Sequence, residues 1–130
     1  NNSNLAAKAA SGSARFDGYV ICPASGTTIG KIAAGISDNL ATRSALVAMK
    51  ERRKLIIVPR EAPYSTPHLK AMFNLSEWGA VILPASPGFY QSPRNIEDLI
   101  DFVVARILDQ LDVDHTLGKR WTGEEVPSED

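Results

Sequence analysis

The chain has 130 residues, of which 44% are hydrophobic and 22% charged, and its formal net charge is -1. This length fits one domain with a moderate core and leaves no room for two, and the balanced charge gives no reason to expect nucleic acid or an anionic membrane as a partner. No apolar run approaches the ~20 residues of a membrane span, and no signal peptide is visible, so we expect a cytoplasmic protein.

The cysteine and histidine content argues against a disulfide and against a metal site. Cys22 is the single cysteine, which fits a reducing compartment; it lies in an apolar run, so we expect a buried small hydrophobe. His68 and His115 are far apart and have no partners at ligand spacing. We expect His68 to pack or to cap the helix that it opens. Four aromatic residues are expected in the core: Phe16, Phe73, Phe89 and Phe102.

Short apolar strands alternate with helices along the chain. In chain order, the pattern predicts a strand at 16–22, helices at 28–36 and 40–53, a strand at 55–58, a helix at 66–78, a strand at 80–83 and a helix at 96–111. A proline directly follows each strand, Asn39 and Ser65 are good N-caps, and Gly79 is the expected C-cap. The polar residues 112–130 are expected to form an extended tail, with an anchor at Trp121.

The strands are nearly all apolar, which is typical of a parallel sheet covered by helices. We therefore predict a single α/β domain with a parallel sheet. Three strands make a thin sheet, and the usual opening strand with its Gly-rich turn is absent, so we expect the chain to be a fragment, or the visible remainder, of a longer protein.

Right-handed crossovers are expected to place the loops after the three strands along one edge of the sheet. Ligands of such sheets bind outside the carboxyl ends of the strands, so we expect these loops to converge on one site. These loops are residues 23–28, 59–63 and 84–90. The first contains Ser25, Gly26, Thr27 and Thr28 at the start of a helix. Small residues and free N–H groups suit a phosphate or a flavin edge, and an ordinary helix cap explains them equally well.

Several charged residues are candidates for binding an anion. Arg43 and Lys50 share one helix face and can bind an anion together. The alternative interpretation is that they belong to a solvated helix end without a ligand. Arg60 follows a buried strand and is placed for bidentate anion contact, and the adjacent Glu61 can act as an acid or base. Tyr90 and Arg106 complete the set, although neither points to function by itself.

Several sequence runs, taken with their spacing, are typical of one family. They are Asp38–Arg43, Lys50–Leu55, Val58–Pro63, His68–Leu69, Gly79–Pro84, Phe89–Tyr90, Ile96–Leu99, Arg106–Asp109 and Arg120–Gly123. Together they resemble the UbiX family of flavin prenyltransferases over roughly residues 11–123, and the segments Lys50–Arg53 and Pro59–Glu61 are quite specific.

The resemblance implies a Rossmann-like, flavodoxin-like three-layer sandwich, of which this chain would be the C-terminal portion. It also implies bound FMN, a dodecameric assembly and a site between subunits. It also implies transfer of a dimethylallyl group from dimethylallyl phosphate to N5 and C6 of reduced FMN. The product, prenylated FMN, would pass to a partner decarboxylase, for example in ubiquinone biosynthesis.

The resemblance also implies a role for each candidate residue. FMN would be contacted by Ser25, Gly26, Thr27, Thr28 and Arg60. The prenyl phosphate would be surrounded by Lys50, Glu61, Tyr90 and Arg106, with Arg43 and Ser11 nearby. Glu61 would handle the proton, and Trp121 would close the site of a neighbouring subunit.

Two other interpretations remain open at this point. The residues Ser25–Thr28 are also similar to the corresponding motif of cysteine-decarboxylase flavoproteins, so an FMN-dependent decarboxylase or oxidoreductase of that superfamily is one alternative. A non-catalytic fragment that only packs in an assembly is the other.

Overall fold

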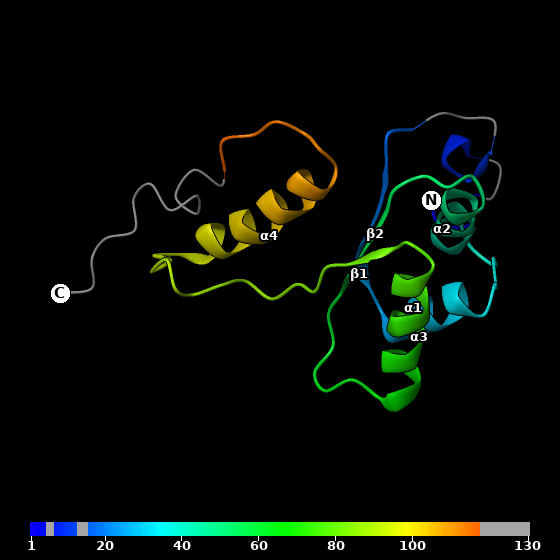
Figure 1. Cartoon of the computed structure of the whole chain (residues 1–130), viewed down its shortest axis with the longest axis horizontal. Helices are drawn as coiled ribbons and strands as arrows, with labels where there is room; N and C mark the ends of the chain where they lie inside the picture. The colour runs from blue at the N-terminus through cyan, green and yellow to red at the C-terminus, as the bar shows by residue number, and fades with distance from the viewer. Residues whose placement is uncertain (5–6, 13–15, 118–130) are drawn as a thin grey trace. The chain divides into compact units, whose positions relative to one another are not determined.

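The structure, a computed structural model, describes residues 1–4, 7–12 and 16–117. The chain packs as two compact units, residues 1–84 and 85–130 (Figure 1). The first unit contains the 3-10 helix η1 (Lys8–Ala10), β1 (Tyr19–Ala24), α1 (Gly26–Ala33), α2 (Leu40–Lys50), β2 (Leu55–Pro59), α3 (Thr66–Glu77) and β3 (Val81–Ile82). The second unit contains α4 (Ile96–Gln110).

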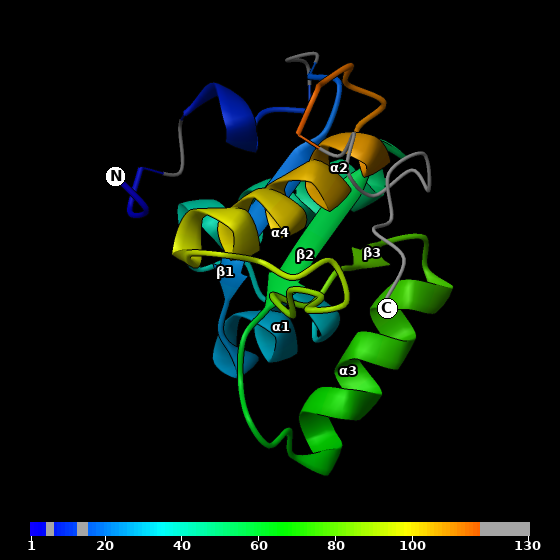
Figure 2. The same ribbon diagram turned by 90° about the vertical axis from the view of Figure 1, so that its left-hand side faces the viewer.

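The first unit is built on a parallel sheet in the order β1-β2-β3, which Figure 2 shows side by side. Right-handed crossovers between neighbouring parallel strands place their helices on one face of the sheet. In agreement, α1 packs against both α2 and α3, and Figure 1 shows the three helices on the same side of β1 and β2. The predicted α/β fold with a parallel sheet is confirmed.

The core lies around β2, whose five residues are all buried. β2 is the central strand of the sheet, and its near-continuous run of Leu, Ile and Val is typical of a parallel strand that is buried on both faces. From the helical side, Ile29 and Ile32 of α1 and Leu75 of α3 are 0–1% exposed. Burial of each such side chain contributes about 1.5–3 kcal/mol, and this packing fixes the start of α1 against the sheet.

Local sequence signals set the helix ends. Asn39 accepts a hydrogen bond from the Thr42 backbone N–H, and the Thr42 side chain returns one to Asn39, which forms a capping box. α2 ends at Lys50, three residues before the predicted end, because Arg52 adopts a left-handed φ of 57°. Gly79, with a φ of 101°, follows the end of α3 as predicted.

Two predictions about burial are wrong. Cys22 is exposed, because β1 is an edge strand that runs on through Pro23 to Ala24, with an irregular register after Ile21. Phe16, Phe73 and Phe89 are 42%, 63% and 67% exposed, in contrast to the half-buried Phe102. A helix such as α3 buries only one stripe of its surface, and Phe73 lies outside that stripe.

Within the described residues, no helix is both long enough and apolar enough to cross a membrane.

Candidate functional site at the carboxyl edge of the sheet

The start of α1 is held by hydroxyl groups. Ser25 is the N-cap, and its Oγ accepts a hydrogen bond from the Thr28 backbone N–H at 3.2 Å. The Ser25 and Thr28 hydroxyls also lie 3.1 Å apart. Thr27 is exposed, whereas Gly26 is buried. The predicted helix cap is therefore present, and it leaves the Thr27 side chain available to a ligand.

The first two loops converge as predicted. Ala24 and Pro59 are register partners in β1 and β2, so Ser25 and Arg60 leave the sheet side by side. The Gly26 backbone N–H donates a 2.7 Å hydrogen bond to Oε1 of Glu61. A carboxylate thus occupies the positive end of α1, where a negative charge is favoured by the helix dipole.

The structure adds His68, which sequence reasoning assigned to packing or capping. Its Nδ1 lies 3.6 Å from Oε2 of Glu61, and the ring fills the space that a side chain on Gly26 would need. A Cβ built on Gly26 would lie 2.2 Å from His68 Cε1. The sequence offered one signal for this position, since His68 is the third residue of the helix that follows the Pro-Arg-Glu loop. The contact of His68 with Gly26 and Glu61 becomes visible only once α3 packs on α1.

Arg60 is exposed at the end of β2. Its guanidinium makes no hydrogen bond or ion pair with the part of the chain that the structure describes. The side chain is therefore free to bind an anion through two parallel N–H donors.

Lys50 and Ser11 lie at the opposite, amino edge of the sheet. Lys50 ends α2, five residues before Leu55, which forms the first pair of the ladder with Tyr19. Its Nζ is 3.6 Å from Oε1 of Glu51 and close to Gly12, the neighbour of Ser11. The five residues of β2, at about 3.3 Å each, span ~16 Å. Within one chain, Lys50 and Glu61 are therefore not brought together.

Arg43 lies in the first half of α2, and its side chain is exposed.

In the second unit, Tyr90 and Arg106 lie on the same side of α4. The Tyr90 ring makes an edge-to-face contact with Phe102, with 6.2 Å between ring centroids. Phe102 is one helical turn before Arg106. Arg106 Nη1 donates to Asp109 Oδ2 at 3.0 Å, and the other oxygen of Asp109 is 2.6 Å from His115 Nε2. The Arg106 guanidinium is thus held in place by a carboxylate.

Trp121, the remaining predicted site residue, lies outside the described residues. In the described ranges there is also no group of three or more His, Cys, Asp or Glu side chains that could hold a metal ion.

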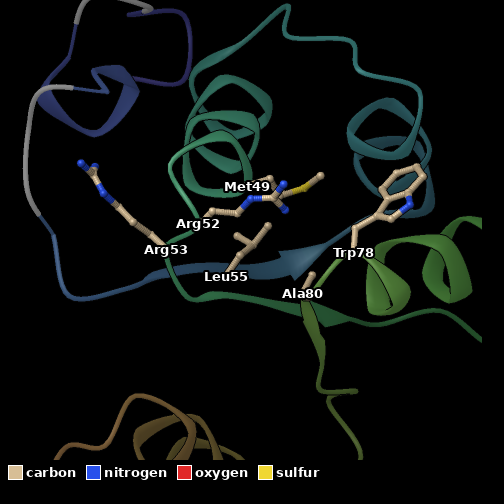
Figure 3. A pocket seen from close by; sticks show the side chains of 7 residues that line it. Met49, Arg52, Arg53, Leu55, Trp78 and Ala80 are labelled. Atoms are coloured by element: carbon tan, nitrogen blue, oxygen red, sulfur yellow. The ribbon is translucent and has the colours of Figure 1, made fainter.

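A cavity of about 140 Å³ lies at the amino edge of the sheet, away from Gly26 and Glu61. Figure 3 shows Arg52, Met49 and Trp78 around it, with Leu55 beneath and the Arg53 side chain directed away. The cavity contains none of the predicted site residues. It is lined by Met49, Arg52, Arg53, Leu55, Trp78, Gly79 and Ala80.

A sequence model of the family described as "Flavoprotein" matches residues 1–108. The "Flavin prenyltransferase UbiX" of Thermoplasma acidophilum is 57% identical over 118 residues, which are 91% of this chain and 66% of that protein. The protein of the same name from Pseudomonas aeruginosa is 51% identical over 93% of this chain and 58% of its own length. The chain thus spans about two thirds or less of the length of these curated relatives.

Solved structures show the same fold. The crystal structure of AnUbiX (PadA1) in complex with FMN and dimethylallyl pyrophosphate has a TM-score of 0.88 and 45% identity over 96% of this chain and 66% of that one. A dodecameric FMN-dependent UbiX-like decarboxylase from Escherichia coli O157:H7 has a TM-score of 0.85 and 45% identity, covering 88% of this chain and 63% of that one. The cysteine decarboxylase TvaF is 22% identical with a TM-score of 0.52, a likeness of fold alone.

Proposed function

The chain belongs to the flavoprotein family, and we propose that it is part of a flavin prenyltransferase that transfers a dimethylallyl group from dimethylallyl phosphate to reduced FMN. The observation that carries the proposal is the placement of Glu61 at the start of α1, where it is hydrogen-bonded to Gly26 and adjacent to Arg60, which has no partner within the described ranges. Sequence identities of 57% and 51% to two flavin prenyltransferases, over 91% and 93% of this chain, support the proposal.

The residues of the first loop fit a flavin nucleotide. Ser25, Gly26, Thr27 and Thr28 present small side chains, hydroxyls and a helix N-terminus, which suit close approach of a planar ring or a phosphate. Arg60, which has no partner among the described residues, adds a cation beside them. When bound in its reduced form, FMN supplies the nucleophilic N5 and C6 atoms that accept the dimethylallyl carbons.

The cations and Tyr90 would act on the leaving phosphate. Transfer breaks the bond between the dimethylallyl carbon and the phosphate oxygen, so negative charge accumulates on that oxygen. Lys50, Arg106 and the Tyr90 hydroxyl can stabilise it electrostatically, with Arg43 and Ser11 near the same phosphate. Cations and a hydroxyl group that bind the phosphate provide this assistance without a metal ion.

Glu61 would move the proton. Its Oε1 is engaged by the Gly26 N–H at 2.7 Å, so Oε2 is the oxygen free to accept or return a proton. The side chain is 34% exposed, which leaves it accessible to a ligand at the carboxyl edge. General acid-base catalysis of this kind contributes about 10²–10⁴-fold to a rate.

The proposed site is shared between copies of the chain. Because Lys50 and Ser11 lie at the amino edge and Glu61 at the carboxyl edge, one copy cannot present both to one phosphate. A homo-oligomer, in which α2 of one subunit meets the carboxyl edge of another, would bring them together. The dodecameric relative from E. coli supports this assembly, and Trp121 would close a neighbour's site.

The proposal places the enzyme in the cytoplasm, because reduced FMN and the free thiol of Cys22 both fit a reducing compartment. The prenylated FMN would be used by a partner decarboxylase.

The decisive experiment is an anaerobic incubation of the purified protein with reduced FMN and dimethylallyl phosphate, followed by mass spectrometry of the flavin. Intact mass and the visible spectrum of the protein are measured first. We expect FMN carrying one dimethylallyl group. An unchanged flavin with both dimethylallyl phosphate and dimethylallyl pyrophosphate, in a protein that shows a flavin spectrum, would contradict the proposal.

One alternative enzyme has an observation in its favour. The Ser25–Thr28 motif is similar to the corresponding motif of cysteine-decarboxylase flavoproteins, and the solved FMN-dependent cysteine decarboxylase TvaF has a similar fold. Carbon dioxide released from a cysteine-containing peptide, with no prenylated flavin in the first assay, would favour that function. If no flavin binds at all, the chain acts only as a packing subunit.

A further inference from the structure

His68 lies beside the proposed binding residues and has no role in the reaction described above. Its ring nitrogen Nδ1 is buried and has no hydrogen-bond partner within the described residues. An imidazole nitrogen that is removed from water without a partner is costly, so its presence calls for an explanation. The nearest carboxylate oxygen, Oε2 of Glu61, is 3.6 Å away.

The position of His68 is fixed from two sides. Its backbone N–H is capped by Ser65 Oγ at 3.4 Å, at the start of α3. Its ring lies where a Cβ of residue 26 would be, 2.4 Å from Nδ1. Only glycine at position 26 allows the ring to lie this close to the start of α1, so the same residue that donates to Oε1 also makes room for the imidazole.

Glu61 therefore lies between two groups, a backbone amide at one oxygen and an imidazole nitrogen at the other. The amide is held rigidly by α1, whereas the 3.6 Å separation from Nδ1 is slightly longer than a hydrogen bond. A small rotation of either side chain closes it. The oxygen that faces His68 is also the one left free for proton exchange.

We propose that His68 is a positioning residue for Glu61: its Nδ1 donates a hydrogen bond to Oε2 and holds the carboxylate in one orientation while that carboxylate exchanges a proton. The inference rests on the proposed function, since it concerns the same carboxylate. Misplacement of a catalytic group by about 1 Å can lower a rate about 10²-fold, so loss of the imidazole has a measurable effect although His68 does not touch the substrate.

The test uses two substitutions of similar size. His68→Asn keeps an N–H donor near the place of Nδ1, and His68→Leu removes it. We expect His68→Leu to lower kcat for flavin prenylation about 10- to 100-fold with little change in KM for dimethylallyl phosphate. His68→Asn is expected to restore most of kcat. In a Glu61→Gln background, His68→Leu is expected to cause no further loss, because the residues act as a unit.

Equal losses in the Leu and Asn variants, or a loss of the same size with and without Glu61, would overturn the proposal and leave His68 as a packing residue. Urea unfolding of each variant separates this outcome from simple destabilisation. If His68→Leu does not fold, the comparison of His68→Asn with wild type decides, since a donor-keeping variant is then expected within a few-fold of the wild-type kcat.

A second readout does not depend on prenylation. Nitrogen-15 NMR of the imidazole rings is recorded for the wild-type protein and for Glu61→Gln. We expect the Nδ1 signal of His68 to move and those of His115, whose partner is Asp109, to stay. If no prenylated flavin forms but the His68 signal moves, the contact stands and the proposed function fails. An unchanged His68 signal overturns the contact itself.

Discussion

At the carboxyl edge of the sheet in the first unit, the carboxylate of Glu61 lies between the Gly26 amide and the His68 ring, and Arg60 beside it has no partner among the described residues. At the amino edge, Arg53 donates to the Tyr19 hydroxyl at 3.1 Å and to the Gly12 carbonyl at 2.9 Å. At the amino edge, Arg53 thus uses its hydrogen bonds to connect segments of the chain. At the carboxyl edge, Arg60 and Oε2 of Glu61 remain able to bind a ligand.

This difference follows from the direction of the strands. Loops after parallel strands are free to vary because the sheet and helices already hold their ends, so ligand-binding groups collect there. The turn between α2 and β2 has to aim the next strand into the sheet, and its hydrogen bonds are used for that purpose. Lys50 is the exception, since its proposed role requires another copy of the chain.

The largest effect is expected from removing the charge of Glu61. Glu61→Gln keeps the shape of the side chain but cannot exchange a proton, so we expect prenylation to fall about 10²-fold or more, measured as the rate of formation of prenylated FMN. The matched control is Glu77→Gln at the end of α3, near the amino edge. Similar losses in both variants would remove the functional distinction between the edges.

The next effect concerns two glycines of α1. In Gly26→Ala, the new methyl group would meet the ring of His68 at 2.2 Å, and we expect a loss of about 1–3 kcal/mol in the free energy of unfolding. Gly30→Ala adds the same methyl group where nothing lies within 4 Å, and a gain of about 0.5–1 kcal/mol is expected. Urea unfolding measures both, and a stable Gly26→Ala protein would show that His68 is not packed there.

At the amino edge, two neighbouring arginines are expected to behave differently. Arg53→Met breaks the hydrogen bonds to Tyr19 and Gly12, which should lower the free energy of unfolding by about 1–3 kcal/mol. Arg52→Met removes a guanidinium that has no partner within the described ranges, and its effect should stay within about 0.5 kcal/mol. Chemical denaturation of the two variants in parallel measures this difference. Equal effects would show that the hydrogen bonds of Arg53 to Tyr19 and Gly12 do not stabilise the fold.

The smallest effect on stability is expected from the Lys31–Asp38 ion pair in the region between α1 and α2, which belongs to neither of the two edge sites described above. A 2.8 Å hydrogen bond from the Lys31 ammonium lowers the pKa of Asp38 below its ordinary value of 3.8. A lowered pKa in the folded state means that the stabilisation is present above about pH 4 and is lost as the pH falls through the lowered value.

The measurement for this loop is the urea midpoint of wild type and Asp38→Asn at several pH values. Wild type should be slightly more stable at pH 7, and the difference should vanish in strong acid. Because the pair is exposed, high salt should reduce the difference as well. A difference that persists unchanged at low pH would exclude the ion pair as its cause.

Much of this arrangement is predictable from local patterns. The short apolar runs, the caps Asn39 and Ser65, and Gly79 after α3 are signals that act within a few residues, and the elements formed close to the predicted positions. Proline was a less accurate signal, because Pro23 lies inside β1 and Pro59 is the last residue of β2. The parallel pairing of β1 and β2 then required the loops of Gly26 and Glu61 to meet, because the carboxyl ends of neighbouring parallel strands lie at the same edge of the sheet.

The burial of single side chains and the exact end of a helix were not predictable from local patterns. Cys22 reads as a core residue from its apolar neighbours, but it lies near the end of an edge strand that continues through Pro23. Arg52 ends α2 early through its positive φ, although its residue type favours a helix.

The sequence by itself determined the α/β class, the family motifs and the meeting of the first two strand loops, since these depend on short-range patterns and on strand direction. Only the tertiary structure decided that His68 fills the space beside Gly26 and faces Glu61, and that Lys50 lies at the other edge. Such contacts join residues from separate helices and strands, and they arise from the packing of α1, α2 and α3 on one sheet rather than from spacing along the chain.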